Sequence, residues 1–162
     1  MGCASFVGRS FVASLVGVLC WAGGGCSSYS APSLKVVQGT TAERSADAVV
    51  LNFLIEGENP NDVALPLKDV RYDLYVGGRK IFSGYRSPEA TLRRFGTRQL
   101  ILPVAVPVAQ AGDLAGNASY RLEGVLEYTT PGAWAELLFD NDLRRPSVTF
   151  RGEGQLDQPA GG

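Results

Sequence analysis

The chain has 162 residues, of which 45% are hydrophobic, and its 15 basic and 16 acidic residues give a net charge of −1. It contains no histidine, which excludes Ser–His–Asp triads and zinc sites built on imidazole. Its basic residues are scattered, so nucleic acid is not an expected partner.

Residues 1–25 predict a secretory signal peptide. Arg9 is the one charged residue in this segment, and the apolar run that follows over residues 10–22 leads into three glycines. A membrane-spanning helix needs about 20 apolar residues, and this run is shorter. We therefore expect a mature chain that begins at Cys26.

Cys26 is the candidate lipidation site. Cys3 and Cys20 lie within the signal, so Cys26 is left without a disulfide partner after cleavage. A cysteine that follows small residues at the end of an apolar run resembles the lipobox of bacterial lipoproteins, where the thiol takes a diacylglyceryl group. Ordinary secretion with an unused thiol is the alternative. Ser27 replaces the aspartate of an inner-membrane retention signal, which favours the outer membrane, facing the periplasm.

The first residues of the mature chain are small and polar. Residues 26–33 predict a flexible tether between the lipid and the domain. The partner expected from this segment is the membrane, which the acyl chains would enter.

Alternation of apolar and other residues predicts about eight short strands. The expected strands are residues 34–38, 49–55, 70–76, 80–85, 97–106, 120–128, 133–139 and 147–155.

Turn residues separate these strands. Asn59-Pro60-Asn61 predicts a rigid turn, because proline fixes φ and asparagine side chains bond their own backbone. Gly77-Gly78 predicts a two-residue hairpin, since both central positions require φ > 0. Residues 86–96 predict a polar connection, and residues 107–115 one or two helical turns.

Pro103 and Pro107 fall on the same side of the strand over residues 97–106. Proline lacks the N–H group that a central strand donates, so this strand is expected at an edge or a strand end. Regular short strands without a long helix predict an all-β, antiparallel β-sandwich over residues 34–156. Residues 157–162 are expected to be a disordered tail.

The order of these motifs resembles the water-stress and hypersensitive-response (WHy) domain of the late embryogenesis abundant group 2 proteins. The matching positions are Asn59-Pro60-Asn61, Leu65-Pro66-Leu67, Tyr72, Leu74, Gly78 and Gly84. The resemblance implies a fibronectin-like sandwich with at most one short helix, a role in desiccation or other stress tolerance, and no enzymatic activity.

Other polar groups have ordinary explanations as well as functional ones. Residues 140–142 (Asp-Asn-Asp) carry calcium-type oxygen ligands but lack the glycine and distant glutamate of a calcium loop, which favours a turn. Two arginine doublets could contact anionic headgroups or could be solvated. Trp134, Tyr75 and Tyr85 could form a contact face or pack across strands. No cofactor or metal site is expected.

These observations favour a non-enzymatic, lipid-anchored envelope protein that protects or binds envelope components, either proteins or lipids. An envelope assembly or transport accessory, binding a lipid or apolar peptide between the sheets, is the alternative. It is motivated by the partly apolar outer side of residues 49–55. A hydrolase is the remote third class, because no catalytic motif is present.

Overall fold

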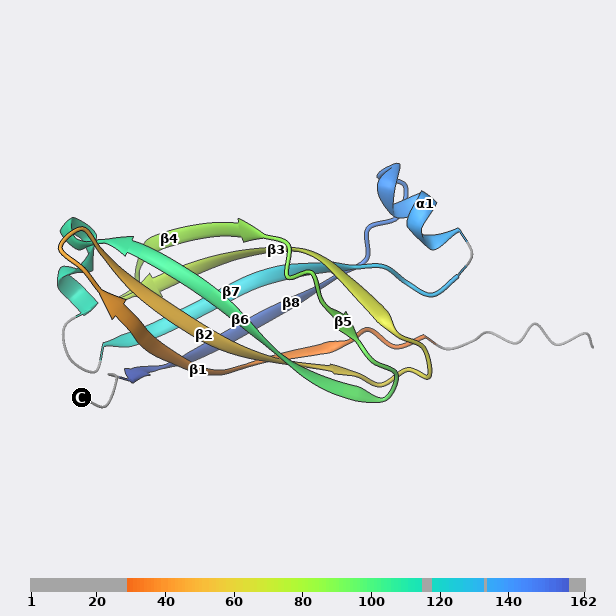
Figure 1. The fold of residues 1–162 in the computed structure, drawn as a ribbon, viewed down its shortest axis with the longest axis horizontal. Helices are drawn as coiled ribbons and strands as arrows, with labels where there is room; N and C mark the ends of the chain where they lie inside the picture. The colour runs from red at the N-terminus through yellow and green to blue at the C-terminus, as the bar shows by residue number, and fades with distance from the viewer. Residues whose placement is uncertain (1–28, 115–117, 133, 158–162) are drawn as a thin grey trace, which may run out of the picture.

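The computed structural model describes residues 29–114, 118–132 and 134–157. These residues form eight strands, a 3-10 helix (η1) and a short α-helix (α1) (Figure 1). The elements are β1 Ser33–Arg44, β2 Ala48–Asn59, β3 Leu65–Val76, β4 Arg79–Arg86, β5 Thr91–Leu92, β6 Gly96–Pro107, η1 Val108–Leu114, β7 Ser119–Tyr128, α1 Ala135–Asp140 and β8 Ser147–Asp157. The predicted all-β class with one short α-helix is confirmed.

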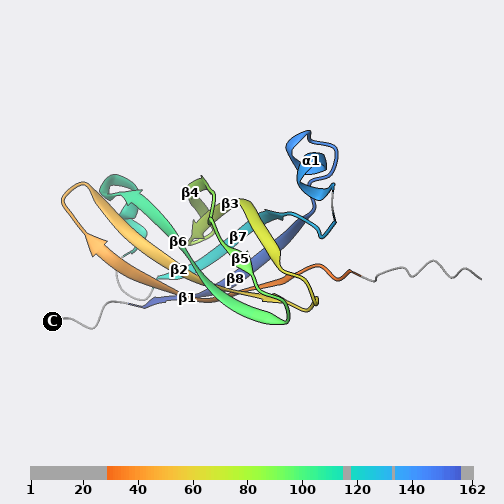
Figure 2. The ribbon, with the colours of Figure 1, turned by 45° about the vertical axis from the view of Figure 1, so that its right-hand side comes forward.

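The strands form one curled sheet in the order β4-β3-β7-β8-β1-β2-β6, with β5 paired to β3. Figures 1 and 2 show that β1, β2 and β6 cross over the half made by β3, β4, β7 and β8. The two layers of the predicted sandwich are therefore two halves of one continuous sheet. The pairings are antiparallel except between β1 and β8, which run parallel where Gly39 faces Leu156 and Thr40 faces Asp157.

The join between β1 and β8 is a place of close approach. A Cβ atom on Gly152 would lie 2.3 Å from the Cβ of Val36, which is closer than real Cβ contacts, and one on Gly39 would lie 3.1 Å from the Leu156 side chain. Glycine at these two positions therefore lets the two halves approach closely. We call this join the β1–β8 seam.

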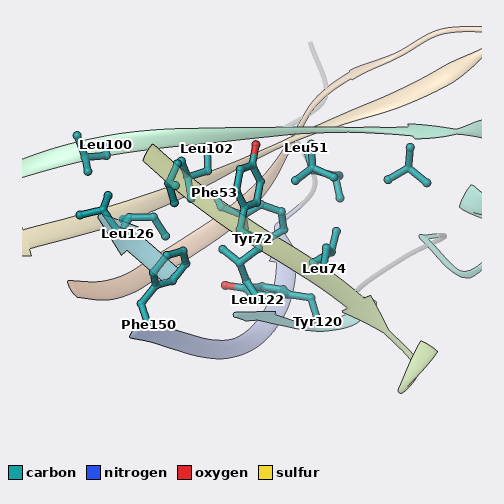
Figure 3. Close-up of a cluster of buried hydrophobic side chains, with 14 of the residues drawn as sticks. Leu51, Phe53, Tyr72, Leu74, Leu100, Leu102, Tyr120, Leu122, Leu126 and Phe150 are labelled. Carbon is teal, nitrogen blue, oxygen red and sulfur yellow. The ribbon is translucent and has the colours of Figure 1, made fainter. Parts of the chain in front are cut away.

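Side chains from both halves fill the space between them, as Figure 3 shows for part of the core. Phe53 of β2 packs edge-on against Tyr120 of β7, with ring centroids 5.0 Å apart. Full burial of such a side chain contributes about 1.5–3 kcal/mol. On β2 the opposite residues are half-buried, which agrees with the partly apolar character of that face in the sequence.

β6 lies at one end of the strand order, as its prolines predict. Pro103 cannot donate a hydrogen bond, and its carbonyl accepts one from the Tyr72 hydroxyl at 2.6 Å. That bond joins β6 to β3, and thus links the two halves at the side opposite the seam. An incoming strand would meet missing donors at Pro103 and Pro107.

The prediction of a strand over residues 133–139 is wrong, because residues 135–140 form the helix α1. Ala135, Glu136 and Leu137 are good helix formers, which outweighs the short apolar pattern. Asp142 then takes the left-handed conformation (φ 58°), and the Leu143 amide donates to the Leu138 carbonyl. This arrangement ends the helix in the usual αL manner.

Two further segments differ from the predictions. The connection expected over residues 86–96 contains β5, in which Leu92 is fully buried and pairs with Leu65. Residues 29–33, part of the expected tether, contact the domain: the Tyr29 ring lies 6.2 Å from that of Tyr128, and Pro32 is buried. Residues 29–33 are therefore held against the domain by these contacts and do not form a free tether.

The predicted hairpin and the predicted helical turns are present, whereas the predicted tail begins one residue too early. Gly77 and Gly78 have φ values of 57° and 80°, as a tight hairpin requires. Residues 108–114 form η1, a 3-10 helix of about two turns. Asp157 of the expected tail belongs to β8, and the rest of that tail lies outside the described residues. Within the described part of the chain, no helix is long and apolar enough to cross a membrane.

Candidate functional site

A broad hollow lies on the outer face of the half made by β4, β3, β7 and β8. Its volume is about 800 Å³ and it is open to solvent. The lining residues are Arg71, Tyr72, Asp73, Ser83, Gly84, Tyr85, Glu123, Gly124, Val125, Thr149, Phe150 and Arg151. We call this surface the outer-face hollow.

Strand register explains how these residues come together. One row across the four strands is Ser83, Asp73, Glu123 and Arg151, and a second is Tyr85, Arg71, Val125 and Thr149. Between them runs the row Gly84, Tyr72, Gly124 and Phe150, in which both aromatic side chains are directed into the core. Because neighbouring rows of a sheet point to opposite faces, the middle row supplies the floor and the outer rows the walls.

The charged wall is internally paired. Lys80 Nζ lies 2.7 Å from Asp73 Oδ2, and the Ser83 hydroxyl donates to Asp73 Oδ1 at 2.6 Å. Both donors hold the pKa of the Asp73 carboxyl below its usual range, and the carboxylate raises the pKa of Lys80. Arg121 Nε is 3.6 Å from Glu123, which extends this ladder of charges along the face.

Cations and aromatic rings alternate on the same face. The Arg121 guanidinium lies 4.2 Å from the centre of the Tyr75 ring, a cation–π distance. Arg71 lies 5.8 Å from the Tyr85 ring, which is 62% exposed. A hydrogen bond to Asp69 raises the pKa of Tyr85. Tyr75 packs across strands while Tyr85 remains available for contact.

This arrangement favours binding over chemistry. Asp73 is the carboxylate nearest a hydroxyl, but its lowered pKa makes it a weak general base. Lys80 is held protonated and cannot activate Ser83 either. Among the described residues there is no group of three or more carboxylates or thiols that could hold a metal ion.

The space between the two halves does not offer a second site of this kind. Phe53, Leu74 and Leu122 are fully buried there and belong to one continuous core. The second hollow, of about 210 Å³, also opens outward, beside Gly77 and Gly78 of the hairpin. The structure therefore gives no support to a ligand held between the sheets.

Asn59 and Asn61, the most distinctive residues of the sequence, form an internal hydrogen-bond centre. The Asn59 side chain donates to the carbonyls of Val63 at 2.7 Å and Arg93 at 3.0 Å. Its Oδ1 accepts from both the backbone and the side chain of Asn61. Asn61 in turn exchanges two hydrogen bonds with the backbone of Ser30.

These bonds tie the start of the domain, the turn between β2 and β3, and the connection before β6 to one point. Asn59 is fully buried and Asn61 is 8% exposed, so neither presents a free polar group to a ligand. Pro60, between them, is exposed. The structure places this motif in the turn-fixing role that the residues predict.

Other candidate positions lie apart from the outer-face hollow. In residues 140–142, Asn141 donates to the Leu137 carbonyl and Asp142 pairs with Arg145, so the segment closes α1 as a turn. Trp134 is 70% exposed beside α1. Cys26 lies outside the described residues.

The outer-face hollow itself is missing from the sequence prediction. Its residues come from four strands that are separated along the chain, and only the register brings them into rows. The available signal was the run of polar outward positions, such as Arg71, Asp73 and Glu123, on strands with an otherwise apolar face.

Fold and surface together define the class of domain: a curled all-β sheet with a filled core and an amphipathic outer face. The family model for late embryogenesis abundant protein (LEA_2) matches residues 55–154, which include the turn at Asn59 and the hairpin. The chain belongs to this family. The LEA_2 family is generally non-enzymatic.

Solved structures share the fold. AT1g01470 from Arabidopsis thaliana is 18% identical, with a TM-score of 0.59 over 82% of this chain and 88% of that chain. A putative late embryogenesis abundant protein, At2g46140.1, is 23% identical, with a TM-score of 0.56 over 78% of this chain and 71% of its own. A protein from Archaeoglobus fulgidus is 13% identical, with a TM-score of 0.51 over 76% of this chain and 97% of that chain. A search of curated proteins finds no significant match.

Proposed function

We propose that this protein is a non-enzymatic, lipid-anchored envelope protein that binds and protects envelope components during drying and related stress. The outer-face hollow is the observation that carries the proposal. It is a preformed surface in which Asp73, Glu123 and Arg151 already have ion-pair partners, and exposed groups such as Tyr85 and Arg71 stand at its rim. Such a surface suits shallow, reversible contact with polar material.

Paired charges matter for a protective role. Free carboxylates or ammonium groups would bind counter-ions strongly as water is withdrawn, whereas the Asp73–Lys80 pair is satisfied within the protein. The rim still offers hydrogen-bond donors and an aromatic ring to a partner. Family membership supports the same role, since stress tolerance is what the resemblance implies.

The anchor is the second part of the proposal and depends on Cys26. Acylation there would hold the protein at the outer membrane, facing the periplasm. We expect Cys26→Ser to abolish incorporation of labelled fatty acid and to release the protein from the membrane fraction. Continued acylation of that variant would contradict the anchor.

The protective role is tested in a strain that lacks the gene, by viability after drying and rehydration. Complementation with the wild-type gene should restore survival, and the double variant Arg71→Ala/Tyr85→Ala should not. Both side chains are exposed, so the variant is expected to fold, which its thermal unfolding would verify. Full rescue by the double variant would contradict a role for the outer-face hollow. Equal survival with and without the gene would contradict the protective role itself.

The alternative, an accessory that carries a lipid or apolar peptide between its sheets, finds no support in the packed core. Native mass spectrometry of the protein purified from envelopes would reveal a co-purified ligand if this alternative were correct.

A further inference from the structure

The described chain begins at one end of the long axis of the molecule. Ser30 is fixed to Asn61 by two hydrogen bonds, of 2.9 Å and 2.8 Å, and the Tyr29 ring packs against Tyr128. In Figures 1 and 2 this orange start of the chain lies at the same end as α1, and η1 lies at the opposite end. The direction from which the preceding residues approach is therefore set by the domain.

The most exposed large apolar side chains gather at this end. Among the described residues, Leu143 (75% exposed), Phe95 (73%) and Trp134 (70%) rank highest. Leu137 of α1 is also more than half exposed. The Phe95 amide donates to the Asn61 carbonyl, which places Phe95 beside the residue that holds Ser30. Single exposed apolar residues are ordinary, but several at one end of a molecule indicate a contact surface.

The backbone at Phe95 adds a second observation. Phe95 has a φ value of 46°, in the left-handed region that a bulky side chain rarely adopts. Such conformations cost about 1–3 kcal/mol and concentrate where a side chain has a function. Here the strained residue presents its ring to solvent instead of packing it in the core.

The length of the preceding chain brings this end close to any anchor at Cys26. Cys26 and Tyr29 are three positions apart, and an extended chain covers at most about 3.6 Å for each position, or roughly 11 Å in all. Acyl chains on Cys26 would thus keep this end of the domain beside the lipid headgroups. The inference rests on the anchor of the proposed function.

Charged side chains surround the apolar ones at this end. Lys68 pairs with Glu136 and Arg145 with Asp142, while Arg93 and Arg94 directly precede Phe95. These cations can stay at the level of the lipid phosphates while the apolar side chains enter more deeply. Tryptophan beside leucine is suited to the membrane interface, where an apolar body and a polar N–H are both accommodated.

We propose that Phe95, Trp134, Leu137 and Leu143 insert into the headgroup region of the lipid bilayer that holds the anchor, and that burial of these apolar side chains drives the insertion. We call these four side chains the membrane-facing end. Contact at this end would make the long axis of the domain point away from the membrane surface. The outer-face hollow would then face the space beside the domain and not the lipid. The domain is oriented by two attachments, the acyl chains and the apolar end.

The chain provides its own probes for the test. From Cys26 onward it has one thiol, Cys26, and one tryptophan, Trp134. The mature chain, produced without acylation, is coupled through Cys26 to maleimide lipid in phosphatidylethanolamine–phosphatidylcholine vesicles. We expect a blue shift of the Trp134 emission and quenching by brominated acyl chains, both unchanged by added salt. Leu137→Asp/Leu143→Asp should remove most of the quenching, because aspartate disfavours the apolar region.

A matched control places the probe at the far end. In Trp134→Phe/Val108→Trp, the single tryptophan lies on η1, and its emission should not respond to the vesicles. Unquenched emission from tethered, folded wild type, or equal quenching at both positions, would overturn the membrane-facing end. The maleimide tether replaces natural acylation, so this result is independent of whether Cys26 is lipidated in cells.

Discussion

Asn59 shows how one buried side chain can replace a short element of structure. Its amide group reaches the carbonyls of Val63 and Arg93, and its oxygen receives two donors from Asn61. Two segments that are far apart in the sequence meet at this amide, and Asn61 joins Ser30 to the same centre. An aspartate in its place would keep the acceptor and lose both donated bonds.

We expect Asn59→Ala to lower the free energy of unfolding by about 2–4 kcal/mol, because it leaves several buried polar groups without partners. Urea unfolding followed by circular dichroism measures this change. Asn141→Ala is a matched control: it also removes one asparagine-to-carbonyl bond, to Leu137, but at an exposed position. It should cost under about 0.5 kcal/mol. Equal effects of the two substitutions would contradict the central role of Asn59.

Tyr72 links stability to alkaline pH. Burial raises the pKa of its hydroxyl, which also donates to the Pro103 carbonyl. The unfolded chain loses the phenol proton near pH 10, before the folded chain does. The contribution of Tyr72 is therefore complete below about pH 10 and is lost as the pH rises above that value.

Tyr72→Phe should cost about 1 kcal/mol at neutral pH through the lost hydrogen bond. It should also make the alkaline fall in stability shallower. Tyr120 and Tyr29, whose pKa values are raised by burial as well, maintain a residual slope. Unfolding free energies measured between neutral pH and pH 11 test both effects, and a steeper alkaline fall in the variant would contradict the assignment.

At the scale of elements, sequence patterns predict the strands well and the short elements poorly. The alternation in β2, β3 and β7 is long enough to identify one buried face, which is why those strands were found. β5 has only two residues, and its pairing depends on Leu65, which is remote in sequence. In α1 a six-residue stretch fits a strand or a helix equally, so propensity and the burial of Phe139 decide.

The hairpin between β3 and β4 allows backbone strain to be separated from crowding. Nothing lies within 4 Å of a Cβ atom built on Gly77 or Gly78, yet both residues have positive φ. Gly78→Val should therefore cost about 1–2 kcal/mol from conformation alone. Gly77→Asn should be neutral or slightly stabilising, because asparagine tolerates this region and restricts the unfolded chain. Thermal unfolding of the two variants distinguishes these outcomes. A similar loss of stability in both variants would indicate that crowding, and not backbone conformation, determines the effect.

At the scale of the whole molecule, the β1–β8 seam holds the two halves together. Gly152→Ala places a methyl group against Val36, so we expect a loss of about 1–3 kcal/mol from overpacking. Gly112→Ala, where the added atom meets open space, should change stability by under about 0.5 kcal/mol. Urea unfolding of the two variants provides the comparison. An unchanged free energy of unfolding in Gly152→Ala would show that the β1–β8 seam can shift to accommodate the added methyl group.

At this scale, the functional surfaces of the molecule could not be predicted from the sequence. The missing histidine already excludes catalytic and zinc sites that are built on imidazole, and this conclusion needs no geometry. The outer-face hollow and the membrane-facing end require knowledge of which strands are neighbours and where the chain begins in space. Phe95 and Trp134 are far apart in the sequence, and no local pattern relates them.

The seam also has a consequence for the order of events during synthesis. It pairs the first strand with the last, so Leu156, a core residue, can join Gly39 only when nearly the whole chain has been made. Contacts of such large sequence separation form late. A nascent chain lacking β8 has an open sheet and an incomplete core. The two halves can therefore close on one another only after the C-terminal strand has been synthesised and has paired with β1.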